Sequence, residues 1–329
     1  MLKELDNIRP KKISNLEVNL SYEKILNLKE ISDKSDGFGA KASNMGVLIN
    51  TVEDDFSIKG FAVPFYFYSE FMKYNKLDNE LHKLLKDDSL YKSSETLNKI
   101  LLEFRILIKN GSFPEWMIQE FKIMQDMFPK GSDIRLRSSS NNEDMKDFNG
   151  AGLYSSVLFR SNTELIEDSI KKVWSSLWSY RAVQERSFHK IEHLNVSMGI
   201  LVHQNISIEK YNGVVVSKNL YNNNYDGIYI NVQHGQSLVT NPDKEEQSDQ
   251  LLVSATGKDK KYEIQYIRYS NLANTNQTVM SESEVLQLLN QVQLIHQKFQ
   301  HLLNKRNDNN FAMELEFLMT KDSKLKILQ

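Results

Sequence analysis

A short strand pattern followed at once by mostly polar residues is the feature that most restricts how this chain can fold. The strand pattern is DIRLR, residues 133–137, and the polar stretch RLRSSSNNEDMKDFNGAG covers residues 135–152. Side chains alternate along a strand, so Ile134 and Leu136 are expected to face the core while Asp133, Arg135 and Arg137 share the other face. Almost nothing in the polar stretch can fill a core, which favours either a solvated loop or a polar binding site at the strand end.

Composition and charge exclude several classes of protein. A length of 329 residues suggests two domains or lobes, and a net charge of −2 offers no basic field for nucleic acid or an anionic membrane. The absence of cysteine excludes a disulfide scaffold and thiolate metal sites and favours a reducing compartment. We find neither a signal peptide nor an apolar run long enough to span a membrane, so we expect a cytoplasmic protein with no membrane partner.

The pattern of helices and strands predicts an α+β protein in two lobes. Helical spacing predicts two helices within residues 78–110, with Gly111 as a C-terminal cap, and one helix over residues 163–193. Strand patterns follow in MGILVHQNI, GVVVS, GIYINVQ and YEIQYIRY, and residues 240–261 are expected to be a loop. Ser281 and Glu284 form a capping box for a further helix. Its expected apolar face comprises Val285, Leu288, Leu289, Val292, Ile295, Phe299 and Leu302.

The closing segment FAMELEFLMTKDSKLKILQ predicts a hairpin with two carboxylates on one face. Glu314 and Glu316 would share that face, and Met313, Leu315 and Phe317 the other. Carboxylates spaced in this way can hold Mg²⁺ together with nucleotide phosphates. The alternative is an edge strand with a solvated charged face.

Two further segments carry cations that suit phosphate. Backbone N–H groups of the glycine turn GFGAK could cradle a phosphate, with Lys41 adding a point charge, although the segment is not a P-loop and could be a simple helix entry. Arg137 ends the first strand with a planar fork that matches two phosphate oxygens. Hydroxyls from residues 138–140 could add hydrogen bonds, and Glu143 and Asp144 could orient the loop or join a metal shell.

Five motifs in order resemble the nucleotide-binding, ATP-grasp domain of the pyruvate phosphate dikinase and phosphoenolpyruvate synthase family. They are GFGAKASNMG, GFAVPFYF, LRSSSNNEDMKDFNGAG, VWSSLWSYRAVQERS and ELEF…LKILQ. The resemblance implies a two-lobe ATP-grasp fold with mixed or antiparallel sheets and flanking helices. It also implies a lead-in over residues 1–30, an N-terminal part over 31–132, and a central and C-terminal lobe with the acidic hairpin over 133–329.

The same resemblance implies an ATP-dependent phosphotransferase that uses ATP and Mg²⁺. The phosphoryl acceptor would be a phosphohistidine domain or a small molecule. Lys41 and Arg137 would contact the phosphates as the catalytic cations, and the loop from Gly150 to about Tyr154 would close over the nucleotide. His203 stands where the family usually has a glutamine near the adenine. Glu316 would bind metal or nucleotide with Glu314 beside it, and Gln329 would lie next to the triphosphate. The tryptophan helix would be core, with Trp174 and Trp178 as packing residues.

Departures from the family pattern leave alternatives open. The family's Gly-Leu-Gly-Glu turn reads VQHGQSLV here, and the arginine two positions after the closing glutamine would lie beyond Gln329. The swivel and pyruvate-binding domains are absent from this sequence, and His234 is not assigned the phosphohistidine role. A fragment of a longer protein, a reaction completed elsewhere, or a catalytically inactive nucleotide sensor would each account for them.

A separate motif, HKIEH, has the form of a zinc-peptidase sequence. On a helix, His189 and His193 lie four residues apart and could reach one zinc ion, with Glu192 as the catalytic acid or base. The alternative is a charged helix end, since nothing in the sequence specifies a third ligand.

Overall fold

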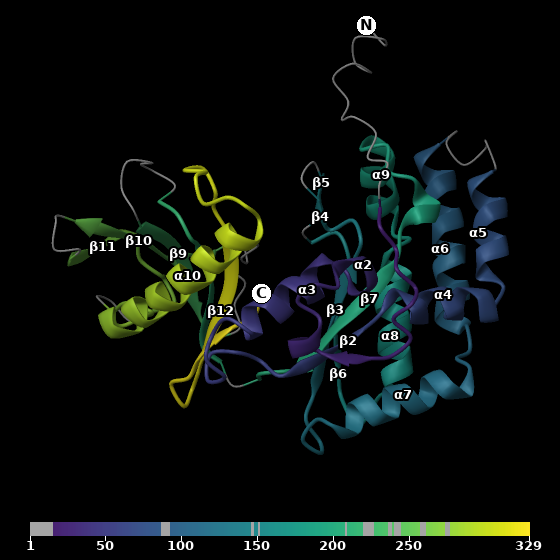
Figure 1. Ribbon diagram of the computed structural model, residues 1–329, viewed down its shortest axis with the longest axis horizontal. Coiled ribbons are helices and arrows are strands. Elements are labelled where there is room, and N and C mark those ends of the chain that lie inside the picture. Colours follow the sequence, from purple (N-terminus) through teal and green to yellow (C-terminus); the bar gives the residue numbers. More distant parts are fainter. Residues whose placement is uncertain are drawn as a thin grey trace, which may run out of the picture. The chain divides into compact units, whose positions relative to one another are not determined.

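Two antiparallel sheets organise the chain, one in each of the two units into which it divides (Figure 1). The computed structural model describes residues 16–86, 93–145, 148–150, 152–207, 209–219, 227–235, 239, 245–256, 261–273 and 277–329. Unit 1 comprises Met1–Val47 and Lys59–Asn205, and unit 2 comprises Leu48–Ile58 and Ile206–Gln329. The α+β, two-lobe prediction is confirmed.

Unit 1 contains a five-stranded sheet in the order β1-β2-β7-β3-β6, a two-stranded β4-β5 ribbon, and flanking helices. Its strands are β1 (Leu26–Asn27), β2 (Gly60–Val63), β3 (Ile134–Ser140), β4 (Asp144–Met145), β5 (Phe148–Asn149), β6 (Ser156–Phe159) and β7 (Met198–Gln204). Its helices are η1 (Leu28–Glu30), α2 (Ser35–Phe38), α4 (Phe65–Tyr74), α5 (Leu77–Leu85), α6 (Ser94–Asn110), α7 (Glu115–Asp126), α8 (Ile166–Ser176), α9 (Tyr180–Phe188) and η3 (His193–Asn195). Helix α3 (Ala40–Ile49) begins in unit 1 and ends in unit 2.

Unit 2 contains a six-stranded sheet in the order β11-β10-β9-β8-β12-β13 and one long helix that packs on it. The elements are β8 (Glu209–Val216), β9 (Gly227–His234), β10 (Asp249–Thr256), β11 (Lys261–Arg268), α10 (Glu282–Leu302), β12 (Glu314–Thr320) and β13 (Leu325–Ile327). Side chains of α10 bond to an inner strand and to an edge strand of the sheet: Glu284 accepts from Lys210 of β8, and Gln293 donates to Tyr262 of β11. The helix therefore crosses the sheet between β8 and β11 (Figure 1).

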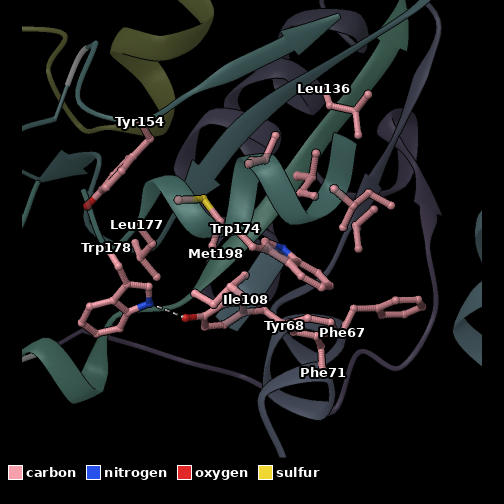
Figure 2. Close-up of a cluster of buried hydrophobic side chains, with 14 of the residues drawn as sticks. Phe67, Tyr68, Phe71, Ile108, Leu136, Tyr154, Trp174, Leu177, Trp178 and Met198 are labelled. Atoms are coloured by element: carbon pink, nitrogen blue, oxygen red, sulfur yellow. Dashed lines mark hydrogen bonds between the residues drawn. The ribbon is translucent and has the colours of Figure 1, made fainter. Parts of the chain in front are cut away.

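The core of unit 1 is rich in aromatic side chains that come from its helices. Trp174 lies 5.2 Å from Phe71 and 5.6 Å from Tyr68, measured between ring centroids. Trp178 is equally buried, and its indole nitrogen donates to the Tyr68 hydroxyl at 2.9 Å (Figure 2). A buried indole N–H usually has such a partner, whereas that of Trp174 has none among the described residues. The prediction that both tryptophans are packing residues is confirmed.

Sequence periodicity predicted the helix faces well. The α6 pattern is confirmed, with Ser93 capping the helix by accepting from Thr96 N and Gly111 as the C-terminal cap. The capping box of α10 is present, and its predicted apolar face is buried except for Leu302, which is 48% exposed. Among the described residues, no helix is long and apolar enough to cross a membrane.

Three predicted features differ from the structure. The single helix over residues 163–193 is instead α8 and α9, because Ser179 adopts an extended conformation and caps α9 by accepting from Ala182 N. The loop predicted over residues 240–261 contains β10, which pairs with β9 and β11. The two units also divide the chain elsewhere than the predicted ranges 31–132 and 133–329, because β2, from the first of these ranges, pairs with β7, from the second, inside unit 1.

Two adjacent leucines of α6 provide a direct test of this packing. Leu101 is 1% exposed and Leu102 is 51% exposed. We expect Leu101→Ala to lower the free energy of unfolding by about 2–5 kcal/mol, because it leaves a cavity in the core. The same substitution at Leu102 should cost less than about 0.5 kcal/mol. Urea denaturation of both variants measures the difference, and equal costs would contradict the orientation of α6.

Candidate functional site

A glycine at the start of α3 lets this helix approach the end of β3. Gly39 has φ +85° and ψ 157°, a combination that is essentially restricted to glycine. A Cβ atom there would lie 2.4 Å from the carbonyl oxygen of Ser139. The backbone N–H of Ala42 donates to Ser139 Oγ at 2.9 Å, so β3 supplies the helix with an acceptor for one of its free N–H groups. Lys41 is thereby held beside the segment that follows β3.

The carboxylate of Glu143 is the centre of the contacts made by that segment. Its Oε1 accepts from Lys41 Nζ at 2.9 Å and from Ser138 Oγ at 3.0 Å, and its Oε2 accepts from Ser140 N at 2.9 Å. The Glu143 side chain is 2% exposed and that of Lys41 is 13% exposed. Because a buried charge is costly unless it is paired and hydrogen-bonded, this ion pair fixes both residues. These are the loop-orienting contacts predicted as one role of Glu143. The side chain of Asp144 is not among those that the structure describes.

The face of β3 that carries arginines also carries a buried histidine of the neighbouring strand. Ile134 and Leu136 are buried, and Arg135 and Arg137 are half-buried on the opposite face, so the predicted alternation is confirmed. Arg135 stands opposite His203 in the β3–β7 register. The guanidinium of Arg135 donates to Asn205 Oδ1 at 3.2 Å.

His203 is a neutral histidine with one nitrogen available for a ligand. Burial, reinforced by the positive charges of Arg137 and Arg135, lowers the pKa of His203 to about 3. Its Nδ1 lies 2.9 Å from the carbonyl oxygen of Gln204, which can only accept, so the ring proton resides on Nδ1. Nε2 is therefore an acceptor, and it has no hydrogen-bond partner among the described residues. Arg135, Arg137 and the Nε2 acceptor of His203 therefore lie on one face of the five-stranded sheet of unit 1.

The predicted nucleotide loop begins and ends on the Glu143 segment. Gly150 N donates to the Glu143 carbonyl at 2.9 Å, and a Cβ atom on Gly150 would lie 3.1 Å from Glu143 Cα. The Tyr154 hydroxyl donates to Asn142 Oδ1 at 3.0 Å, and Tyr154 is 9% exposed. The Tyr154 hydroxyl thus serves this network, while closure of the loop over a nucleotide stays a prediction. Ala151, within this loop, lies outside the described residues.

The acidic hairpin lies in unit 2 and has the predicted alternation. Leu315 and Phe317 are buried, whereas Glu314 is exposed and Glu316 is half-buried on the other face. Glu316 N donates to the carbonyl oxygen of Gln329 at 2.9 Å, which places these two residues side by side. In the described part of the chain, no group of three or more histidine, aspartate or glutamate side chains is arranged to hold a metal ion. Any cation here would rely on two carboxylates together with ligand oxygens and water.

The helical geometry predicted for the zinc motif is wrong. Helix α9 ends at Phe188, and Lys190 has φ 55°, so HKIEH does not lie on one helix. His193 is buried and its pKa is lowered to about 3, first by burial and then by Arg186. Its Nδ1 accepts from Arg186 and its Nε2 lies 3.1 Å from Ser187 Oγ, so both ring nitrogens have partners within unit 1.

A cavity and a turn of unit 2, as far as the structure describes them, hold none of the predicted site residues. A cavity of about 600 Å³ in unit 2 is lined by Asn50, Thr51, Leu294, Gln297, Lys298, Gln300, His301 and Arg306. In the segment VQHGQSLV, β9 ends at His234 and Gly235 has φ 63°, while residues 236–238 lie outside the described residues.

Comparison with known proteins gives a family for this arrangement. A sequence model of the family described as pyruvate phosphate dikinase, AMP/ATP-binding domain, matches residues 35–329. The chain belongs to this family. The match includes every predicted site residue from Lys41 to Gln329.

Members of the phosphoenolpyruvate synthases resemble parts of the chain. It is 28% identical to phosphoenolpyruvate synthase of Pyrococcus furiosus over 157 residues, which are 45% of this chain and 19% of that protein. It is 26% identical to phosphoenolpyruvate synthase of Aquifex aeolicus over 209 residues, 60% of this chain and 24% of that protein. A probable phosphoenolpyruvate synthase of Pyrococcus horikoshii is 30% identical over 147 residues, 43% of this chain and 18% of that protein. The matched regions thus span about a fifth to a quarter of these relatives.

The structure assigns the residues predicted from the family resemblance to two groups. Lys41, Arg137, Gly150, Tyr154 and His203 belong to unit 1. Glu314, Glu316 and Gln329 belong to unit 2. The convergence of both groups on one nucleotide stays a prediction.

Sequence reasoning missed Asn142 and Arg186, which belong to the polar network around Tyr154. Asn142 Oδ1 accepts from both Ser140 Oγ and Tyr154, and Arg186 donates to Tyr154. The signal for Arg186 was its spacing, because it falls one helical turn after Ala182 and Val183 on the buried face of α9.

Two glycines with similar φ angles test how strictly α3 is docked on β3. Gly39→Ala should lower the free energy of unfolding by about 3 kcal/mol or more, because backbone strain is joined by a clash with Ser139. Gly131 has φ +79° but no atom within 4 Å of a Cβ position, so Gly131→Ala should cost only about 1–2 kcal/mol. Thermal and urea unfolding compare the variants. Equal costs would show that the approach of α3 to Ser139 is not tight.

Proposed function

We propose that this domain binds Mg-ATP and transfers a phosphoryl group from it to a histidine carrier or a small acceptor molecule. The observation that carries the proposal is the family match over residues 35–329, which contains all the predicted phosphate and metal ligands. The contacts of unit 1 support it. Lys41 is fixed by Glu143, and Glu143 is bound to Ser138, the residue that directly follows Arg137. Lys41 is thus held beside the end of the strand that carries Arg137.

Phosphoryl transfer needs cations fixed in place more than it needs covalent chemistry from the protein. The ion pair with Glu143 uses one donor of the Lys41 ammonium. It also holds the ammonium in place, so that its remaining donors can point to phosphate oxygens. Arg137 adds a planar fork that matches two oxygens. In this proposal the two residues hold the phosphates. Negative charge that develops on the phosphate oxygens during transfer is then stabilised by donors that are already in position.

The carboxylates of the closing hairpin suit Mg²⁺. Glu314 and Glu316 share one face of β12 and present only oxygen donors, the ligands that Mg²⁺ prefers. Two protein carboxylates fit the way Mg²⁺ binds with nucleotide, since it keeps several waters and takes phosphate oxygens. When bound, the ion would neutralise phosphate charge. Glu316 would hold it, with Gln329 beside this carboxylate.

His203 is suited to an adenine ring in this proposal. Its Nε2 is a buried acceptor, and its depressed pKa keeps it neutral throughout the physiological range. An acceptor of this kind matches the exocyclic amino group of adenine, which donates. A glutamine, which the family usually has here, can accept through its side-chain oxygen in the same way.

The phosphate clamp is tested by Arg137→Ala. Loss of a charged hydrogen-bonding partner should cost about 2–3 kcal/mol and weaken Mg-ATP binding about 30- to 150-fold. Arg160→Ala is the matched control, since Arg160 is an exposed arginine of unit 1. Calorimetric titration of both variants with ATP and Mg²⁺ measures the effect. Unchanged affinity in Arg137→Ala would refute the clamp.

The metal role is tested by comparing ATP affinity with and without Mg²⁺. In Glu316→Gln we expect the gain in affinity on adding Mg²⁺ to fall about tenfold, since one anionic ligand is lost at constant size. Glu263→Gln, on an exposed position of β11 in the same sheet, serves as the control. The same Mg²⁺ gain in all three proteins would argue against Glu316. ATP binding without phosphoryl transfer to any candidate acceptor would instead favour a nucleotide sensor.

A further inference from the structure

Arg186 is a buried cation that has no carboxylate partner among the described residues. It is fully buried on α9, with its guanidinium 5.2 Å from the centre of the Trp178 ring. Nε donates to His193 Nδ1 at 3.2 Å, and Nη1 donates to the Leu177 carbonyl at 2.8 Å and to the Tyr154 hydroxyl at 3.2 Å. These acceptors are all neutral: a backbone carbonyl, a tyrosine hydroxyl, and His193, which burial keeps neutral. Nη2 has no hydrogen-bond partner among the described residues. A buried charge without an opposite charge is costly, so its contacts need an explanation beyond stability.

The contacts of Arg186 continue as a chain of hydrogen bonds. The Tyr154 hydroxyl accepts from Arg186 and donates to Asn142 Oδ1 at 3.0 Å. The same amide oxygen accepts from Ser140 Oγ at 2.7 Å. Each of these side chains is at most 9% exposed, so water cannot readily substitute for a missing link.

The chain ends at the ion pair of the candidate site. Ser140 joins the two parts, because its hydroxyl donates to Asn142 while its backbone N–H donates to Glu143 Oε2 at 2.9 Å. Glu143 then accepts from Lys41 at 2.9 Å. A cation on α9 is therefore connected to a cation on α3 through one tyrosine, one asparagine amide, one serine by its hydroxyl and its backbone N–H, and one carboxylate.

We propose that Arg186, acting through Tyr154 and Asn142, is a positioning residue that holds the Glu143 carboxylate and thereby sets the place of the Lys41 ammonium. The hydroxyl of Tyr154 is polarised by the Arg186 guanidinium and so donates more strongly to Asn142. Asn142 and Ser140 belong to the turn that carries Glu143, so their hold on this turn fixes the carboxylate. The consequence for nucleotide affinity rests on the proposed function, whereas the consequence for Lys41 does not.

A lysine-labelling experiment tests the chain without any nucleotide. The full chain is treated briefly with acetic anhydride, and acetylation of Lys41 is measured by mass spectrometry relative to Lys99, an exposed lysine of α6. In Tyr154→Phe the link from Arg186 to Asn142 is removed while ring volume is retained. Lys41 acetylation should then rise about 2- to 10-fold, the effect of one hydrogen bond. Arg186→Lys, which keeps the charge but loses the fork, should act in the same direction.

Matched controls come from the same helix. Tyr180→Phe removes a hydroxyl for which the described residues offer no hydrogen bond, and Arg181→Lys changes an exposed arginine of α9. Both should leave the Lys41 to Lys99 ratio unchanged. Urea unfolding confirms that each variant is folded, and Tyr154→Phe, the mildest change, keeps the test valid if Arg186→Lys does not fold. An unchanged ratio in folded Tyr154→Phe would overturn the proposal.

A double-mutant cycle separates positioning from a general structural role. Tyr154→Phe should weaken Mg-ATP binding about 2- to 10-fold in the wild-type background and have no effect in the Lys41→Met background. The same loss in both backgrounds would show that Tyr154 does not act through Lys41. If the wild type binds no ATP, the proposed function fails, and the labelling ratio still decides whether the chain positions Lys41.

Discussion

The buried carboxylate of Glu143 is the constraint on which the candidate site of unit 1 depends. An ionised side chain that is 2% exposed must be satisfied by donors, and two separate segments of the chain supply three of them. Lys41 comes from α3, Ser138 from β3, and the N–H of Ser140 from the end of that strand. Removing any one of these donors would leave part of the negative charge of the buried carboxylate unsatisfied. The carboxylate therefore holds all three donor residues in position.

This constraint answers why a globular chain places so many polar residues directly after a strand. The described residues of the stretch are not a solvated loop, because Ser138, Ser139, Ser140 and Asn142 are buried. Each bonds to a polar group brought in from elsewhere or from the same turn. Ser139, for example, accepts from the start of α3, and Asn142 accepts from Tyr154. These hydrogen bonds hold the backbone around them in place, which a hydrophobic turn at the surface could not do.

Local periodicity predicted what depends on neighbouring residues in the sequence. The alternation along β3 and β12, the capping box of α10 and the apolar faces of the helices follow from spacing alone, and the structure agrees with them. The break between α8 and α9 was missed because apolar spacing continues through it, whereas the cap at Ser179 is a single local hydrogen bond. Strand β10 was missed because its sequence is preceded by charged residues, and its pairing with β9 and β11 is a tertiary contact.

Motif order suggested which residues belong to the candidate site but not which contacts they make. Motif order placed Lys41 and Arg137 in one site, yet nothing in the sequence shows that Lys41 is paired with a carboxylate 102 positions away. Arg186 illustrates the same limit, because a charged residue on a helix is normally assigned to solvent. Its burial follows from packing on Trp178 and from acceptors on three other segments.

The cost of burying Arg186 favours a positional role over a stabilising one. Well-packed apolar residues often replace buried charges with no loss of stability, so stability alone does not explain an arginine here. The fixed directions of its donors do explain it. The Arg186 guanidinium donates to His193, the Leu177 carbonyl and the Tyr154 hydroxyl at once, and so orients all three groups. Tyr154 in turn donates to Asn142, and this bond holds the turn that carries Glu143. The cation of α9 therefore contributes to the site through geometry, since its charge is separated from Lys41 by an opposite charge.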